Sequence, residues 1–381
     1  MVTGRDFYLA PPLPLSAFFC FHDTQTPGEG KWFQLLVIFS GGTPQVYFLA
    51  PGVWALTGVG DTSGKPGIIG GCGIKMGQGR QYIRSQLLKR QLHLTNLDKV
   101  FWPEGLTKFD LIKYYVDMAP FLLPYLRDRP LVLKRYPDGI TGEAFYQKEC
   151  PAYAPDWVTT LPVYHADSSK TINYVLCNNE ETLIWLANQG CIEVHAWLSR
   201  AGRLEYPDIA VMDLDPSAGA TFKDVLDIAL LVHQALKEFN LSGYPKTSGA
   251  TGLHIFIPLE PRWTFHQVTA AMGYLARLVA GVYPRKATTE RSIPKRKNRV
   301  YLDYLQNVRG RSMAFPYSLR PLPGAPVSTP LTWEEVKRGM FSPKDFNIHT
   351  ARERLQAYGD LYRGFLAQPN DLEPLLKLAG V

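Results

Sequence analysis

The sequence predicts a mixed α/β (α+β) fold in which helices pack against a central sheet. Two observations favour it. In the second half of the chain, apolar strand-like runs alternate with long amphipathic segments, in the order strand, helix, strand, helix, strand. In addition, 46% of the 381 residues are hydrophobic, enough to bury the core of one large two-lobed domain or of two ordinary domains.

The first expected helix lies in "TKFDLIKYYVDMAPFLL". Thr107 is its expected N-cap, Asp110 follows three residues later as in a capping box, and apolar residues then recur with helical spacing. The runs "PLVLKRYP" and "INYVLC" are expected strands, and "ETLIWLANQG" is an expected helix that ends at Gly190.

The second half is more regular. We expect strands in "DIAVMDLDP", "LHIFIPL" and "RVYLDYL", and amphipathic helices in "TFKDVLDIALLVHQALKEF" and "TFHQVTAAMGYLARLVAGV". The tail from Trp333 is expected to be mostly helical.

Residues 1–75 differ from the rest, because they are rich in Gly and Pro and contain apolar clusters such as "WFQLLVIF". Two interpretations remain open: a small β-rich appendage, or a segment that is not part of the functional protein. Charge density rises abruptly after Met76, and we expect the functional protein to begin near that residue.

The overall charge favours a polyanionic partner. The formal net charge is +7, and the pI is near 9.0, which is compatible with nucleic acid but does not identify it. The five cysteines form no CxxC pair, so neither a zinc site nor a disulfide framework is expected, and a reducing cytosol fits. No apolar run reaches the roughly 18 residues of a membrane span, and no secretory signal is apparent.

Two acids share one face of an apolar strand. Side chains alternate along a strand, so Val211, Asp213 and Asp215 should point to one side and Met212 and Leu214 to the other. Like charges on one face are costly unless a cation neutralises them, and an all-oxygen site suits Mg²⁺ or Mn²⁺. Alternatively, Asp215 caps a turn before a proline and Asp213 forms a salt bridge.

Other polar groups accompany these acids. Asp303 lies within the apolar run "VYLDYLQN", and three carboxylates on neighbouring strands can hold two metal ions. In the loop of "PKTSGATGLHIFIPL", Gly249 and Gly252 allow a close approach of the backbone to phosphate. Thr247, Ser248 and nearby amides can donate to phosphate oxygens, and His254 follows on the next strand. An ordinary polar hairpin is the alternative for this loop. Side chains suited to a triphosphate then follow, namely Gln306, Arg309, Arg311 and Arg320.

Several motifs in order resemble the archaeo-eukaryotic primase superfamily, and within it the polymerase domain of bacterial end-joining ligase D and its stand-alone relatives. They are "LTNLDKVFWPEGLTKFDLIKYY", "LKRYPDG", "AFYQKECP", "WLANQGCIEVHAWLSR", "DLDP", "KTSGATGLHIFIPL", "YLDYLQN" and "PYSLRPLPGAPVSTPLTWEE". The resemblance covers residues 92–381 and implies a primase-polymerase fold, with an N-terminal lobe (92–200), the catalytic motifs (201–330) and a helical tail (331–381).

The resemblance implies a two-metal nucleotidyltransferase that adds nucleotides, preferably ribonucleotides, to a DNA 3′ end. Asp213, Asp215 and Asp303 would be the catalytic, metal-binding acids, with Mn²⁺ or Mg²⁺ as two ions. The implied nucleoside triphosphate contacts are His195, Ser248, Gly249, Thr251, His254, Gln306, Arg311 and Arg320. Taken alone, His195 could equally be a structural histidine. Relatives often carry Lys where this chain has Thr251, which puts part of the triphosphate contact in question.

The implied DNA contacts lie in the N-terminal lobe. Lys99 and Lys108 match residues that hold the 5′-phosphate of a gap, and Lys108 follows the expected N-cap, where free amides attract anions. Lys134 and Arg135 are further expected contacts, and Phe145 and Tyr146 match an aromatic pair that stacks on template bases. The alternatives are a solvated lysine at 108 and core packing for the two rings.

The resemblance therefore implies a cytoplasmic, nucleoid-associated prokaryotic polymerase that fills or extends broken DNA ends without a membrane association. A Ku-like end-binding protein and a separate DNA ligase would be its partners, since no ligase module is expected within this sequence. Two alternatives remain: a primase that starts chains without a primer, and a catalytically weak module that binds 5′-phosphorylated ends.

Overall fold

The computed structural model describes residues 92–381 and, by their backbone, three strands nearer the N-terminus. These strands, β1 (Ala17–Cys20), β2 (Gln34–Ser40) and β3 (Thr43–Leu49), form an antiparallel sheet in the order β1-β2-β3. The chain divides into two compact units, residues 1–73 and 74–381. The expected start near Met76 lies outside the described residues.

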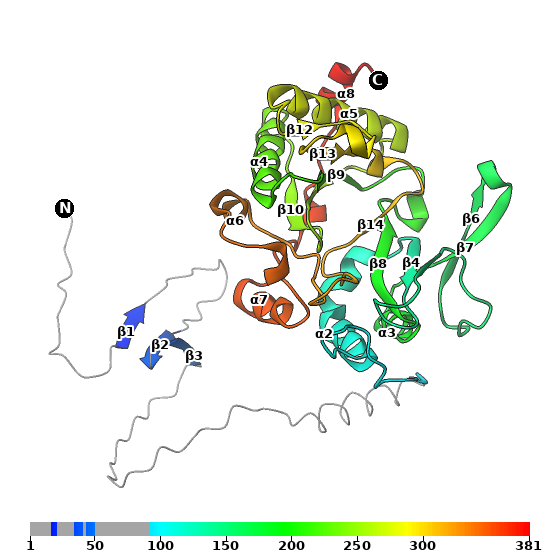
Figure 1. The fold of residues 1–381 in the computed structure, drawn as a ribbon, viewed down its shortest axis with the longest axis vertical. Coiled ribbons are helices and arrows are strands. Elements are labelled where there is room, and N and C mark those ends of the chain that lie inside the picture. Colours follow the sequence, from blue (N-terminus) through cyan, green and yellow to red (C-terminus); the bar gives the residue numbers. More distant parts are fainter. Residues whose placement is uncertain (1–16, 21–33, 41–42, 50–91) are drawn as a thin grey trace, which may run out of the picture. The chain divides into compact units, whose positions relative to one another are not determined.

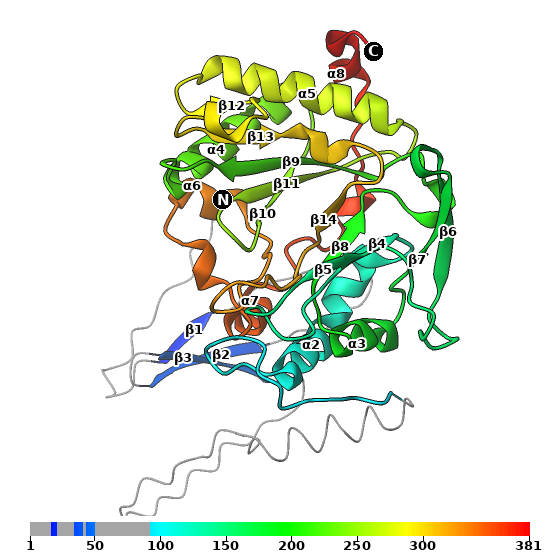
Figure 2. The same ribbon diagram turned by 45° about the vertical axis from the view of Figure 1, so that its right-hand side comes forward.

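Two sheets organise the larger unit (Figures 1 and 2). The five-stranded sheet has the order β10-β11-β9-β13-β12, with β9 (Ile209–Pro216), β10 (Tyr244–Thr247), β11 (Leu253–Pro258), β12 (Ala287–Thr288) and β13 (Val300–Asp303). The four-stranded sheet has the order β14-β8-β4-β5, with β4 (Leu131–Arg135), β5 (Phe145–Gln147), β8 (Cys191–Trp197) and β14 (Ser312–Ala314). A separate hairpin of β6 (Thr160–His165) and β7 (Lys170–Val175) projects from the body in both views.

Two long helices cover one face of the five-stranded sheet. They are α4 (Phe222–Glu238) and α5 (Phe265–Val282), and each begins with a capping box, at Thr221 and Thr264 respectively. Met212 and Leu214 of β9 pack into the same apolar cluster as these helices, whereas Val211 belongs to the cluster on the other side. The predicted alternation along β9 is confirmed, and it directs both aspartates away from α4 and α5.

The four-stranded sheet packs on α2 (Lys108–Leu126) and α3 (Glu180–Asn188). The capping box of Thr107 and Asp110 is present at the start of α2, as predicted. Gly190 follows α3 with φ +75°, a conformation that a side chain would disfavour. Ile192, Val194 and Ala196 of β8 enter the apolar cluster of α2 and α3, and the intervening side chains point to the opposite face.

Two sequence expectations need correction in detail. The strand expected in "RVYLDYL" ends at Asp303, because the Asp303 carboxylate accepts a hydrogen bond from the Leu305 amide and the chain turns into a 3₁₀ helix, Tyr304–Asn307. Asp303 therefore lies at a strand end and not in mid-strand. The tail is also less helical than expected, with α6 (Trp333–Arg338), α7 (Thr350–Tyr358) and α8 (Glu373–Ala379) separated by short 3₁₀ turns and loops.

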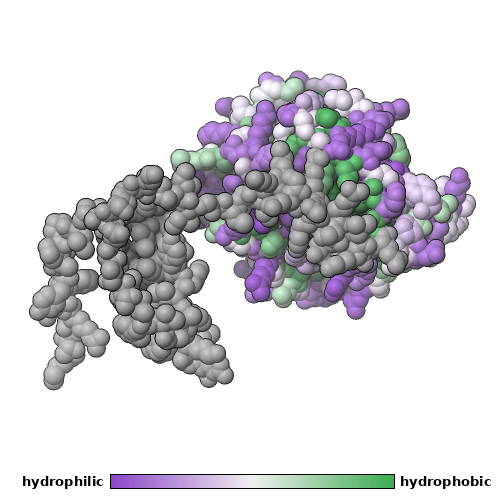
Figure 3. All heavy atoms as spheres, turned by 90° about the horizontal axis from the view of Figure 1, so that it is seen from below, coloured by the Kyte–Doolittle hydropathy of each residue, from purple (hydrophilic) through white to green (hydrophobic). Residues whose placement is uncertain are grey.

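In the described part of the chain, none of the helices is both long and apolar enough to cross a bilayer. The face drawn in Figure 3 is predominantly hydrophilic where it is coloured, with apolar residues in a smaller strip. Cys150, Cys177 and Cys191 are free thiols.

Candidate active site

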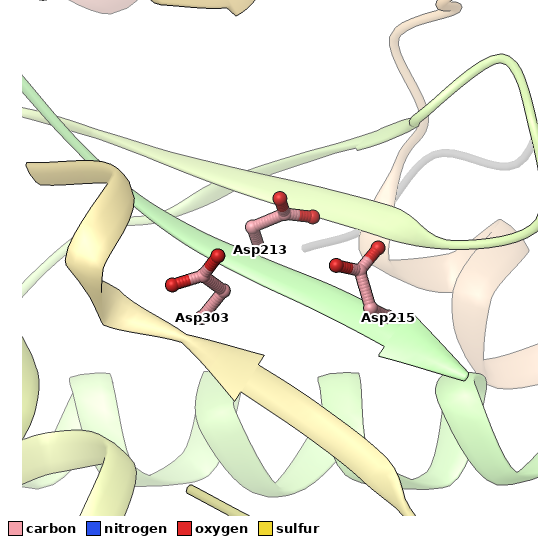
Figure 4. A group of neighbouring side chains, drawn as sticks. All are labelled: Asp213, Asp215 and Asp303. Atoms are coloured by element: carbon pink, nitrogen blue, oxygen red, sulfur yellow. The ribbon is translucent and has the colours of Figure 1, made fainter. Parts of the chain in front are cut away.

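Three carboxylates converge at the centre of the five-stranded sheet. Asp213 and Asp215 extend from β9, and Asp303 extends from the end of the neighbouring β13, so that all three side chains point toward one another (Figure 4). Their nearest ligand atoms all lie within 4.8 Å of one another. Antiparallel pairing causes this convergence, because Asp213 lies directly opposite Asp303 on one side and His254 of β11 on the other.

The mutual repulsion of these buried carboxylates favours binding of a cation. Burial, followed by the charges of Asp215 and Asp303, raises the pKa of Asp213 well above its ordinary value. Burial and the charge of Asp303 likewise raise the pKa of Asp215. Asp213 Oδ1 is buried and has no hydrogen-bond partner among the described residues. Three converging carboxylates with an unpartnered buried oxygen fit a hard divalent ion such as Mg²⁺ or Mn²⁺.

A buried lysine stands behind the cluster. Lys246 Nζ lies 2.8 Å from His254 Nδ1, and it also donates to Ser328 Oγ, whose own hydroxyl donates to Thr247 O at 2.9 Å. The opposite ring nitrogen, His254 Nε2, lies 3.4 Å from Asp213 Oδ1. Burial and the charges of Lys246 and Arg320 lower the pKa of His254 well below its ordinary value. Lys246 therefore orients the imidazole beside Asp213, a role that sequence inspection missed.

A second buried acid lies across from the cluster, on β8. Glu193 Oε1 is 2.7 Å from Arg320 Nε and 3.7 Å from His195 Nε2, and its Oε2 is 3.3 Å from Lys134 Nζ. Burial alone would raise the pKa of Glu193, but His195 and the charges of Arg320 and Lys134 outweigh burial and hold that pKa at about 2. Sequence analysis missed Glu193, although an acid two residues before His195 in an apolar strand carries the same signal as the Asp213 and Asp215 pair.

The glycine loop forms a hairpin turn between β10 and β11. Ser248 Oγ accepts hydrogen bonds from the amides of Ala250 and Gly252, both at 3.1 Å. Gly249 has φ +76°, and a methyl group there would lie 2.5 Å from Arg320 Cγ. The loop thus packs directly under Arg320, and only glycine fits at residue 249. Thr251 is exposed at the tip of the turn.

The expected triphosphate side chains separate into two groups. Arg320 influences Asp213 and Asp215 by its charge, and Gln306 donates to Asp303 Oδ2 at 3.2 Å. Arg309, by contrast, pairs with Glu205 at 2.6 Å and lies over the Trp197 ring. The contribution of Arg309 to a triphosphate site stays a prediction, and in the structure its guanidinium pairs with Glu205. Arg311 is exposed before β14.

The two lysines expected at the 5′-phosphate lie together at the start of α2. The Lys108 amide donates to Lys99 O at 2.8 Å, and Lys108 Nζ donates to Thr95 Oγ1 at 3.2 Å. Burial, then the charges of Lys99 and Arg135, lower the pKa of Lys108 to about 8. The expectation of free helix amides was wrong, because the Lys108 and Phe109 amides both donate to backbone carbonyls.

The two expected stacking rings are on the surface. Phe145 is 43% exposed and Tyr146 is 64% exposed, so core packing is wrong for both. On the neighbouring β4, Arg135 lies 5.2 Å from the Phe145 ring centroid, and Lys134 lies 5.4 Å from the Tyr146 centroid. The Arg135 guanidinium also donates to Gln147, Tyr153 and Gln189.

Comparisons with known proteins agree with this architecture. Residues 107–362 match the family described as LigD, primase-polymerase domain. The bifunctional non-homologous end joining protein LigD of Bacillus subtilis (strain 168) is 34% identical over 298 residues, which are 77% of this chain and 47% of that protein. The multifunctional non-homologous end joining protein LigD of Mycolicibacterium smegmatis is 32% identical over 274 residues, which are 71% of this chain and 35% of that protein. The chain thus spans less than half the length of these curated relatives.

A solved structure extends the similarity to the fold. The polymerase domain from Mycobacterium tuberculosis ligase D in complex with DNA matches with a TM-score of 0.68 and 29% identity, over 74% of this chain and 99% of that one. The sequence match covers most of the chain, and the fold agrees over nearly the whole of that polymerase domain. The chain belongs to the family of LigD primase-polymerase domains.

Proposed function

We propose that this protein is a template-directed nucleotidyltransferase that adds nucleotides, preferably ribonucleotides, to DNA 3′ ends during gap filling or end joining. The observation that carries the proposal is the cluster of Asp213, Asp215 and Asp303, with ligand atoms within 4.8 Å. Membership of the primase-polymerase family and the names of the end-joining relatives support the same function.

The three carboxylates are proposed to hold two divalent ions, Mn²⁺ or Mg²⁺. Bound ions of this kind stabilise the attacking and leaving oxygens of an in-line phosphoryl displacement. The protein's own part is to hold the acids in register. Gln306 fixes the Asp303 carboxylate, and the β9–β13 pairing fixes its distance from Asp213.

The groups around the acids are proposed to receive the nucleoside triphosphate. Arg320 is held over the glycine loop by its ion pair with Glu193, so its charge is positioned before the triphosphate arrives. His195 and His254 approach the same space from the two sheets. Ser248 and Thr251 contribute hydroxyl groups from the hairpin turn, and Arg311 is a further proposed contact.

The DNA end is proposed to bind on the N-terminal lobe. Lys99 and Lys108 would hold a 5′-phosphate, while Phe145 and Tyr146 would stack on template bases, with Lys134 and Arg135 beside them. Solvent exposure of both rings supports this proposal, because base–aromatic stacking contributes about 1–3 kcal/mol per base. A Ku-like protein and a separate DNA ligase are the proposed partners.

Primer extension tests the proposal. The substrate is gapped, 5′-phosphorylated DNA with Mn²⁺ and either ribo- or deoxyribonucleotides, and the matched control is Asp213→Ala. We expect a product ladder that is stronger with ribonucleotides and absent from the variant, which should still bind DNA.

Other outcomes would identify the alternatives. Product from single-stranded template and nucleotides alone would identify a primase. No product from the wild type, together with 5′-phosphate-dependent binding, would identify a module that only binds DNA ends. Normal synthesis by Asp213→Ala would overturn the metal assignment.

A further inference from the structure

An exposed acid lies beside one of the two lysines that are proposed to hold the 5′-phosphate. Asp138 Oδ1 forms an ion pair with Lys99 Nζ. The Asp138 side chain is 69% exposed, and the Lys99 side chain is 35% exposed. The Lys99 ammonium group therefore has an anionic partner within the protein, and a phosphate that binds this group meets a second negative charge.

The turn that carries Asp138 is anchored to the segment that carries Lys99. The Ile140 amide donates to Phe101 O at 2.8 Å. Gly139 has φ +76°, and a methyl group there would lie 2.7 Å from the same carbonyl oxygen, so the two backbones are in direct contact. Backbone packing thus holds Asp138 near Lys99, and the ion pair is a product of the fold.

The neighbouring cations explain what the carboxylate does there. Lys108 Nζ donates to the neutral hydroxyl of Thr95 at 3.2 Å. After burial, the charges of Lys99 and Arg135 have the largest effects on the pKa of Lys108, and both lower it. These cations repel one another, and Asp138 offsets part of the repulsion at Lys99. A 5′-phosphate, which carries about 1.5 to 2 negative charges near pH 7, would offset it at the same ammonium group.

Asp138 and a 5′-phosphate are therefore competitors for Lys99. Two anions beside one ammonium group repel each other, so the carboxylate weakens the attraction between Lys99 and the phosphate. Because the ion pair is exposed and exposed pairs contribute little to stability, a phosphate can still replace the carboxylate. When the phosphate leaves, Asp138 can pair with Lys99 again.

We infer that Asp138 limits the affinity of the protein for 5′-phosphorylated DNA ends, so that a filled end is released for sealing. The inference rests on the proposed function, because it assumes that Lys99 and Lys108 hold the 5′-phosphate. A DNA ligase must use that same phosphate, which it cannot reach while the polymerase holds it. Asp138 is thus a specificity-determining residue that weakens binding of phosphate ends and has little effect on hydroxyl ends.

The test uses Asp138→Asn in the full chain, because asparagine suits a turn as well as aspartate does and only the charge is lost. The matched control is Asp227→Asn, which neutralises the acid of another exposed lysine–aspartate pair, on α4. Fluorescence anisotropy measures binding to gapped DNA with a 5′-phosphate or a 5′-hydroxyl, and a stopped-flow chase with unlabelled DNA measures dissociation. Lys99→Gln tests the underlying phosphate site separately.

We expect Asp138→Asn to bind the phosphorylated DNA about threefold more tightly than the wild type, within the roughly 1.4- to 5-fold range that corresponds to an exposed ion pair. Most of this gain should come from slower dissociation. The affinity of Asp138→Asn for hydroxyl-ended DNA, and both affinities of Asp227→Asn, should equal those of the wild type. Lys99→Gln should lose most of the wild-type preference for phosphorylated ends.

Two kinds of result would contradict these expectations, and they separate the inference from the proposed function. Equal or weaker binding of phosphorylated DNA by Asp138→Asn, or an equal gain on both DNAs, would overturn the inference alone. A wild type that does not distinguish the two ends, or an unchanged preference in Lys99→Gln, would overturn the proposed 5′-phosphate site as well.

Discussion

Replacing Asp213 by Asn should stabilise the metal-free protein. Two unit charges 4.8 Å apart, the limit for the cluster, repel each other by about 3.5 kcal/mol at an effective dielectric constant of 20. Asp213 has two such neighbours, but proton uptake limits the total repulsion. Holding a proton at pH 7 on a carboxyl whose ordinary pKa is 3.8 costs at most about 4 kcal/mol.

The amide of Asn avoids this cost but needs hydrogen-bond partners of its own, and an incompletely bonded buried amide costs about 1–3 kcal/mol. We therefore expect the free energy of unfolding in EDTA to rise by about 2 kcal/mol. The pH dependence has a definite sign. Because the pKa of Asp213 is raised on folding, the folded protein binds more protons than the unfolded protein above pH 3.8. The stability of the wild type should therefore fall as the pH rises above 3.8, and the stability of the variant should fall less.

Urea denaturation with EDTA or with Mn²⁺ measures both effects. A ligand at 100 times its Kd stabilises a folded protein by about 2.7 kcal/mol, so Mn²⁺ should stabilise the wild type and have little effect on Asp213→Asn. The control is Asp227→Asn, whose exposed carboxylate pairs with Lys223 on α4 and should change stability by less than about 0.5 kcal/mol. Lower stability of Asp213→Asn in EDTA, or an equal manganese effect in both proteins, would refute the reasoning.

Three further predictions follow from the site. Lys246→Met should remove the contact with His254 Nδ1 and lower kcat for nucleotide addition by about 10- to 100-fold, with DNA affinity unchanged in anisotropy measurements; unaltered kcat would contradict the positioning role. Burial and neighbouring charges lower the pKa of Lys108 to about 8. The protein should therefore bind 5′-phosphate ends more tightly than 5′-hydroxyl ends below pH 8, where Lys108 is charged, and this difference in affinity should decline above pH 8. Lys108→Arg should keep that advantage to higher pH in the same titration, since arginine stays protonated. Gly249→Ala should strain a backbone at φ +76° and displace Arg320, costing about 1–3 kcal/mol of stability and raising KM for the nucleotide; wild-type melting and KM would show that the loop tolerates a side chain.

Local patterns made much of the fold predictable. The capping residues Thr107, Thr221 and Thr264 start helices because their bonds involve residues only three positions away. The period of two along β9 likewise placed Asp213 and Asp215 on one face, because alternation is a property of the strand itself.

Contacts between distant segments were decided only by the tertiary structure. Lys246 and Glu193 could not be assigned from their own neighbourhoods, because each also has a partner far away in the sequence: Ser328 lies 82 positions from Lys246, and Arg320 lies 127 positions from Glu193. The ion pair of Arg309 with Glu205 and the hydrogen bond of the Lys108 amide to Lys99 O were unpredictable for the same reason, because neither partner is a neighbour in the sequence.

The sequence by itself determined the class of fold, the capped helices and the presence of an acidic face, because these depend on short-range sterics and hydrophobic periodicity. The tertiary structure decided which charges meet. Pairing of β9 with β13 and β11 brings Asp303 and His254 to Asp213, and the second sheet supplies Glu193 to hold Arg320. Electrostatic energy depends on distances between strands that no local pattern specifies, and those distances determine the chemistry of the site.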